Sequence, residues 1–153
     1  MTIYCIDTSS LISAWSERYP IKNFPGFWKQ FEKLIDDGRL VSPEEVRHEI
    51  IKKTEGLDVW VKQHRNMFVA LDTDMQLTVR DILAEFPLLT KNLPGHNSAD
   101  PFVITLAKMK NHTVVTEEGL GSINRPRIPF VCEHYKIKCI NILGLIKQED
   151  WVI

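Results

Sequence analysis

The sequence has few cysteines, and none are arranged to hold a disulfide framework. Cys5, Cys132 and Cys139 are the three cysteines among 153 residues, and no two of them form a CxxC pair. An odd number without such a pair argues against a disulfide scaffold and against a zinc site built from paired cysteines. We therefore expect a reducing compartment, the cytoplasm.

Long apolar runs, a glycine-rich phosphate loop and an excess of charge of one sign are also missing. No stretch approaches the ~20 apolar residues of a membrane-spanning helix, so we expect no membrane association. The segment "LPGHNSAD" has one glycine and no Walker or GxGxxG pattern, which argues against a nucleotide-binding module. With 19 basic and 20 acidic residues the formal net charge is −1, so nucleic acid could bind only at a local basic patch.

Short continuous apolar runs alternate with helical patterns along the chain. Runs of this kind predict strands that are buried on both faces of a sheet. The alternation predicts a three-layer α/β/α domain with a mostly parallel sheet, formed as a single domain over residues 1–153. The clearest loop is "LTKNLPGHNSA". We expect strands at residues 3–6, 40–41, 113–116 and 138–143.

Two predicted helices carry recognisable start signals. In "SPEEVRHEIIKK", Ser42 stands at the cap position, Pro43 at the first helical position and Glu45 three residues after the cap, which predicts a capping box. In "DPFVITLAKMKN", Asp100 precedes a proline and is expected to be the N-cap.

Acidic residues directly follow two of the predicted strands. Asp7 ends "IYCI", and Glu117 and Glu118 follow "TVVT". Active sites of open parallel sheets lie beyond the carboxyl ends of the strands, so these acids should meet at one edge. Glu49 lies at the edge of the apolar face of its predicted helix. It is predicted either to pair with Lys53, four residues on, or to point at another positive group.

The order and spacing of these acids resemble the PIN-domain family of metal-dependent ribonucleases, which includes the toxins of bacterial VapC-type toxin–antitoxin pairs. The resemblance covers nearly the whole chain, from "YCIDTSSLI" to "KCINI", and is most specific at "SADPFVITLAKMKNHTVVTEE". Within the family, the "DTSSLI" start and the "IPFVCEHYKIKCINIL" end resemble a little-characterised PIN-like branch.

The resemblance implies a set of site residues. Asp7, Glu49, Asp100 and Glu118 would be catalytic, and Asp7, Asp100 and Glu118 would bind Mg²⁺ or Mn²⁺. The family usually has Asp where Glu118 stands, and the neighbouring Glu117 competes for that assignment. Clustered carboxylates repel one another unless a cation joins them, and hard oxygen ligands suit these two ions. Ser9, Thr116 and Glu117 would support the ligands.

The implied reaction is hydrolysis of RNA phosphodiester bonds. Lys52, Lys53, Arg125 and Arg127 are candidates for holding substrate phosphates, although solvated surface charge explains them equally well. The resemblance further implies an antitoxin protein that covers the acids, and a homodimer.

Two other functions are compatible with the same residues. A catalytically inactive PIN-like module would keep the fold for binding or as a scaffold. A phosphatase with an aspartyl nucleophile would also place Asp after the first strand, but it usually has a second Asp two residues later, where Ser9 stands.

Overall fold

A five-stranded sheet runs through the computed structural model, which describes residues 1–90 and 99–153. The strand order is β3-β2-β1-β4-β5, and every neighbouring pair is parallel. The parallel sheet expected from the apolar runs is therefore confirmed. Most of the loop predicted over residues 89–99 lies outside the described residues. The strands are β1 (Tyr4–Ile6), β2 (Leu40–Pro43), β3 (Phe68–Val69), β4 (Thr113–Val115) and β5 (Cys139–Ile140).

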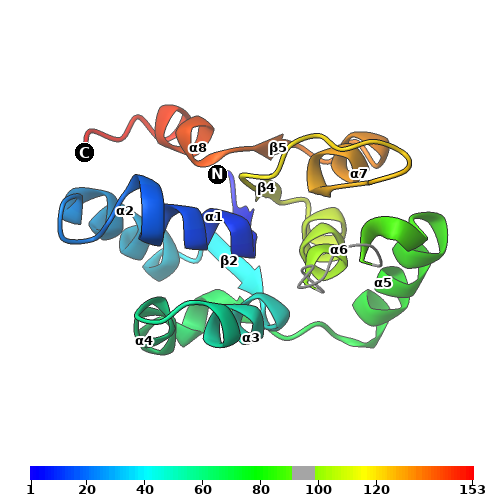
Figure 1. The fold of residues 1–153 in the computed structure, drawn as a ribbon, viewed down its shortest axis with the longest axis horizontal. Coiled ribbons are helices and arrows are strands. Elements are labelled where there is room, and N and C mark those ends of the chain that lie inside the picture. The colour runs from blue at the N-terminus through cyan, green and yellow to red at the C-terminus, as the bar shows by residue number, and fades with distance from the viewer. Residues whose placement is uncertain (91–98) are drawn as a thin grey trace.

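Helices cover both faces of this sheet (Figure 1). Figure 1 shows β5 at the top and β2 lower down, with α1 and α2 on the left and α5 and α6 on the right. None of the helices in the described part is long and apolar enough to cross a membrane. The α-helices are α1 (Thr8–Ser13), α2 (Pro25–Asp36), α3 (Glu44–Lys53), α4 (Leu57–Gln63), α5 (Thr73–Glu85), α6 (Asp100–Lys110), α7 (Ile128–His134) and α8 (Ile142–Gln148). The short helices are the π-helical η1 (Ala14–Arg18) and the 3₁₀ turns η2 (Arg65–Met67) and η3 (Pro87–Leu89).

The core forms on both sides of β1 and β4, the central strands. All six residues of these two strands are buried, as continuous apolar runs require. Helix α6 packs across β1, β2 and β4 and buries seven of its residues, so its first turn is held against the sheet. On the other face, Phe27, Trp28 and Phe31 of α2 are almost fully buried. The central strands therefore place their carboxyl ends with little freedom to move.

The C-terminal strand is shorter than the sequence predicts. The apolar run over residues 138–143 was expected to be one strand, but β5 contains only Cys139 and Ile140. Asn141 interrupts it, because its side-chain oxygen accepts a hydrogen bond from the Gly144 amide and caps α8. Ile142 is therefore helical. Strand β3 and helix α4 were not predicted at all.

Both predicted N-caps at the starts of α3 and α6 are wrong. Helix α3 begins at Glu44, and no side chain caps it. Ser42 belongs to β2, and its hydroxyl donates to the carbonyl oxygen of Ile6 in the neighbouring strand at 2.7 Å. Helix α6 begins at Asp100 itself, after Ala99. At α3 a hydrogen bond to the neighbouring strand replaces the cap, and at α6 the helix begins one residue earlier than the motif suggests.

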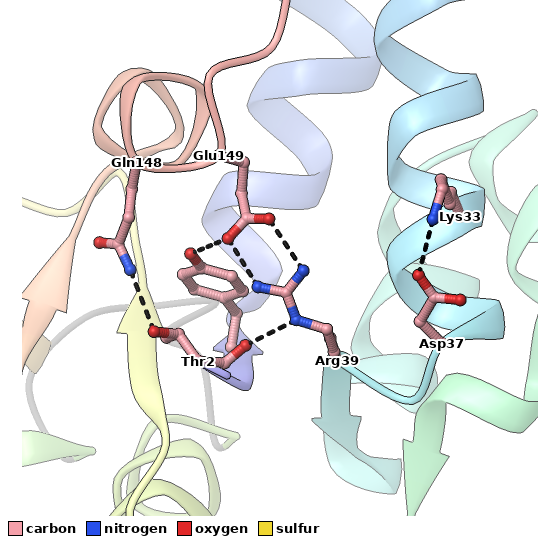
Figure 2. Close-up of polar contacts among 7 residues, drawn as sticks. Thr2, Lys33, Asp37, Arg39, Gln148 and Glu149 are labelled. Carbon is pink, nitrogen blue, oxygen red and sulfur yellow. Dashed lines mark hydrogen bonds and ion pairs between the residues drawn. The ribbon is translucent and has the colours of Figure 1, made fainter.

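At the amino ends of the strands, a buried ion pair ties the C-terminal segment to the sheet (Figure 2). The guanidinium of Arg39 donates to both carboxylate oxygens of Glu149, at 2.9 and 2.7 Å. The Tyr4 hydroxyl donates to the same carboxylate at 2.5 Å, and Arg39 Nε donates to the Thr2 carbonyl at 3.0 Å. The charges of Arg39 and Glu149 therefore neutralise each other at this end of the strands.

Candidate active site

Asp7 lies at the carboxyl end of β1 and is almost completely buried. Its Oδ1 caps α1 by accepting from the Ser10 amide at 2.9 Å. Its Oδ2 accepts from the hydroxyls of Thr116 at 2.6 Å and Ser9 at 2.8 Å. Burial raises the pKa of Asp7 to about 6, against the lowering effect of these three donors, and the charge of Glu118 raises it further. The carboxyl is thus precisely held yet costly to ionise.

Asp100 is the first residue of α6 and is 2% exposed. Burial raises its pKa well above the ordinary value, and the charges of Glu118, Asp7 and Glu49 raise it further, in that order. The charges of the other three acids that the sequence singled out therefore all act on Asp100.

Glu49 connects α3 to the start of α6. Its Oε1 accepts from the Ala99 amide at 3.0 Å and from the Thr8 hydroxyl at 3.3 Å, and its Oε2 lies 3.4 Å from Lys53 Nζ. The pairing with Lys53 that the sequence suggested is therefore present, and the other two partners of Glu49 are uncharged donors. The Glu49 side chain is only 9% exposed, and these contacts hold its carboxylate in place.

The two glutamates after β4 point to different helices. Glu117 Oε1 accepts from the amide of Ile142, the first residue of α8, at 2.9 Å. Glu118 Oε1 accepts from the amide of Ile128, the first residue of α7, at 3.0 Å. Only the charge of Glu118 acts on both Asp7 and Asp100. Glu118 is thus the acid that reaches the cluster, while Glu117 holds α8.

The supporting hydroxyls link the ends of β1 and β4. Ser9 accepts from the Glu117 amide at 3.2 Å, and Thr116 accepts from the Glu118 amide at 3.1 Å, while both donate to Asp7. The loop after β4 is thereby hydrogen-bonded to the first acid.

The four basic residues proposed for substrate do not form one group. Lys53 is paired with Glu49, and Arg127 Nε lies 4.0 Å from Glu118 Oε1. Lys52 at the end of α3 and Arg125 in the turn before α7 are exposed. Two of the four cations therefore face acids of the cluster.

Sequence reasoning missed two contributors, Thr8 and the backbone amide of Ala99, which both donate to Glu49. Thr8 directly follows Asp7 and is buried. A polar residue next to a strand-end acid was the available signal. A backbone amide leaves no signal in a sequence.

The donor set fits a hard divalent cation. Carboxylate oxygens are the ligands that Mg²⁺ and Mn²⁺ prefer. Asp7 receives three donors, and a carboxylate offers about four lone-pair sites, so one remains. A cation beside Asp100 would offset the charges of Glu118, Asp7 and Glu49 that act on it. Within residues 1–90 and 99–153, no three His, Cys, Asp or Glu side chains already have the spacing of a metal centre.

Comparison with solved structures finds the same fold in proteins of low sequence identity. VapBC2 from Rickettsia felis, bound to a DNA fragment from the promoter, is similar with a TM-score of 0.53 and 15% identity over 92% of this chain and 98% of that one. FitAB bound to an IR36 DNA fragment is similar with a TM-score of 0.53 and 14% identity, over 91% and 94%. FitAcB from Neisseria gonorrhoeae gives 0.50 and 14%, over 91% and 97%. At these identities the likeness establishes the PIN-like α/β/α fold.

The family of this chain follows from a match to a protein-family model. The model of a domain of unknown function, DUF4411, matches residues 4–153, and the chain belongs to this family. No curated protein sequence matches this chain.

Proposed function

We propose that this protein is a metal-dependent ribonuclease that hydrolyses RNA phosphodiester bonds. The observation that carries the proposal is the convergence of Asp7, Asp100 and Glu118 at the carboxyl edge of a PIN-like sheet. Three buried carboxyl groups that act on one another are costly to ionise in a metal-free protein. They become favourable when a divalent ion binds among them, so a catalytic cation explains their presence.

In this proposal, Asp7, Asp100 and Glu118 hold a Mg²⁺ or Mn²⁺ ion. The ion, when bound, would supply a water of lowered pKa and neutralise charge on the phosphate. Ser9 and Thr116 fix the rotamer of Asp7 by donating to its Oδ2. Glu49 fixes the start of α6, and with it Asp100, by accepting from the Ala99 amide.

Substrate would approach through a cavity of about 440 Å³ beside the acids. Its lining includes Thr116, Glu118 and the edge strand residues Cys139 and Ile140. We infer that the scissile phosphate enters from this side. Lys52, Lys53, Arg125 and Arg127 remain candidates for phosphates farther along the strand.

The partner we propose is an antitoxin protein, with this chain as the toxin of the pair. The support is that the similar solved structures are of VapBC2, FitAB and FitAcB, toxin–antitoxin assemblies. We further propose a homodimer in the cytoplasm. Co-purification with the product of a neighbouring reading frame, and the mass of the complex in solution, test these two points.

The decisive test is cleavage of a labelled single-stranded RNA in Mn²⁺ by the wild type and by an Asp7→Asn, Asp100→Asn double variant. We expect the double variant to be at least about 100-fold slower, because two of the three ligands proposed for the ion are lost. An Asp72→Asn variant is the matched control, since Asp72 also caps a helix but is exposed. Equal cleavage by wild type and double variant would disprove the proposal.

A second candidate is a catalytically inactive PIN-like binding module. It is favoured by the hydrogen bonds that already engage the acids: three donors on Asp7, and the Ile128 amide on Glu118. Calorimetric titration with Mn²⁺ separates the two candidates, because an inactive scaffold has no need to bind the ion. Turnover of a chromogenic phosphate monoester would instead favour the aspartyl-nucleophile phosphatase.

A further inference from the structure

A second, larger cavity lies at the opposite edge of the sheet from the acids. Its volume is about 790 Å³, and it is formed by the start of the chain, the end of α6, the start of β4 and the segment between α7 and β5. We call it the lysine cavity, because its lining includes Lys108, Lys110, Lys136 and Lys138.

The lysine cavity is strongly positive in a chain whose net charge is −1. None of its lining residues is acidic. Within the part of the chain that the structure describes, none of the four lysines forms an ion pair. Lys108 and Lys110 offset the dipole of the α6 carboxyl end, which accounts for their presence there. Lys136 and Lys138 have no such explanation.

Lys136 is held in a backbone conformation that favours glycine. Its φ is +58°, and it follows α7 in a turn where the Ile137 amide donates to the Cys132 carbonyl at 2.8 Å. Glycine is the usual residue at this position, because a side chain there costs roughly 1–2 kcal/mol. A lysine in this strained position provides positive charge at the cavity at the expense of stability.

Ile137 joins the lysine cavity to the cavity beside the acids. It lines both, and Glu118 and Thr116 line the second one. The two cavities therefore share a lining residue that lies just before β5, the outermost strand of the sheet at this side. A chain-like ligand that follows this strand would reach both the acids and the lysines.

We propose that the lysine cavity binds backbone phosphates of the same single-stranded RNA whose scissile phosphate lies at the acids, a proposal that rests on the proposed nuclease function. The acids repel a polyanion, so its affinity has to come from cations elsewhere on its path. The lysines supply that attraction and set the direction in which the strand lies along β5.

The test is binding of a fluorescein-labelled single-stranded RNA, measured by anisotropy in EDTA over a range of KCl concentrations. For the Lys136→Gln, Lys138→Gln variant we expect roughly tenfold weaker binding at ~0.1 M salt, and a salt slope that is smaller by about 1.4, since each phosphate contact contributes about 0.7. Lys22→Gln, Lys29→Gln removes the same charge from exposed positions at and near α2, and should change neither quantity.

A Lys136→Gly variant guards against misfolding as the cause. It relieves the strained backbone, so we expect a higher melting temperature together with weaker RNA binding. The proposal would be overturned if the double variant kept the wild-type affinity and salt slope. It would also be overturned if the Lys22, Lys29 control showed an equal effect, or if the wild type did not bind RNA. Binding of AMP or inorganic phosphate that depends on Lys136 and Lys138, with unchanged RNA affinity, would also overturn it in favour of a small-anion site.

Cleavage by the same proteins in Mn²⁺ separates this proposal from the nuclease itself. Lysine-dependent RNA binding without cleavage would leave the cavity assignment intact and remove the nuclease. If the wild type cleaves RNA but its RNA binding does not depend on Lys136 and Lys138, the nuclease proposal stands and the cavity assignment is removed.

Discussion

Charged side chains have opposite surroundings at the amino and carboxyl ends of the strands. At the amino edge, Arg39 and Glu149 neutralise each other through two hydrogen bonds, with each side chain only 14% exposed (Figure 2). At the carboxyl edge, Asp7 is held by uncharged hydroxyl and amide donors and faces another carboxylate, that of Glu118. The first arrangement stabilises the fold without any ligand. The second becomes favourable only when a cation arrives.

The largest effect should come from breaking the paired edge. Arg39→Met leaves Glu149 buried without its cation, and we expect the free energy of unfolding to fall by about 3 kcal/mol. Lys33→Met is the matched control, because it breaks an ion pair with Asp37 whose side chains are 71% and 45% exposed, a pair worth less than about 1 kcal/mol. Urea unfolding measures both. Equal losses would show that the Arg39 pair does not close this edge.

The pH dependence of stability should come from the other edge. The folded pKa of Asp7 is raised from 3.8 to about 6, so its stabilising contribution is complete below pH ~4 and is lost as pH rises through ~6. In EDTA we expect the unfolding free energy to fall by about 3 kcal/mol over this range, from a shift of ~2 units.

Asp7→Asn keeps an N-cap side chain and should show a smaller fall, because only that of Asp100 remains, so it should be more stable than the wild type at pH 7. Asp72→Asn, which replaces an exposed cap, should keep the wild-type pH profile. A wild type whose stability rises between pH 4 and 6 would contradict the burial of an ionisable Asp7.

Mn²⁺ should reverse the unfavourable charge at the carboxyl edge. At about 100 times its dissociation constant, the ion should add about 2.7 kcal/mol to the unfolding free energy of the wild type. We expect the gain to grow from pH 5 to pH 7, because protons compete for the carboxylates. Thermal unfolding with and without the ion measures this, and Asp100→Asn should show little gain. An equal gain in that variant would place the ion elsewhere.

The smallest effect should separate the two neighbouring glutamates. Glu117→Gln removes a carboxylate from the first turn of α8, so we expect a loss of about 0.5–1 kcal/mol with unchanged Mn²⁺ affinity. Glu118→Gln loses a similar contact with α7 but relieves repulsion with Asp7 and Asp100, so its stability should change less while its Mn²⁺ affinity falls. Reversed metal affinities would make Glu117 the ligand.

The central sheet could be predicted because its strands are unbroken apolar runs. Strands β1 and β4 are buried on both faces. Two-residue strands such as β3 carry no periodicity, so they cannot be seen in a sequence. The capping box at Ser42 failed because a hydrogen bond to the neighbouring strand replaced the local one.

The candidate site divides in the same way. Asp7 and the glutamates after β4 follow from the rule that parallel strands end at one edge. Asp100 and Glu49 lie on helices, where capping and pairing with Lys53 are sufficient explanations, so the resemblance to PIN domains was needed to give them a role in a site. The same resemblance put Glu118 ahead of Glu117. The lysine cavity could not be predicted, because it depends on how segments far apart in the chain pack together.

The two helix starts held by adjacent glutamates give this protein a built-in pair of spectroscopic reporters. The amide of Ile128 donates to Glu118, and that of Ile142 donates to Glu117. An ion that withdraws electron density from Glu118 would move the Ile128 amide resonance in a ¹H–¹⁵N spectrum and leave Ile142 nearly still. A Mg²⁺ titration followed at these two signals would therefore report whether the ion binds at Glu118 or at Glu117, before any substrate is known.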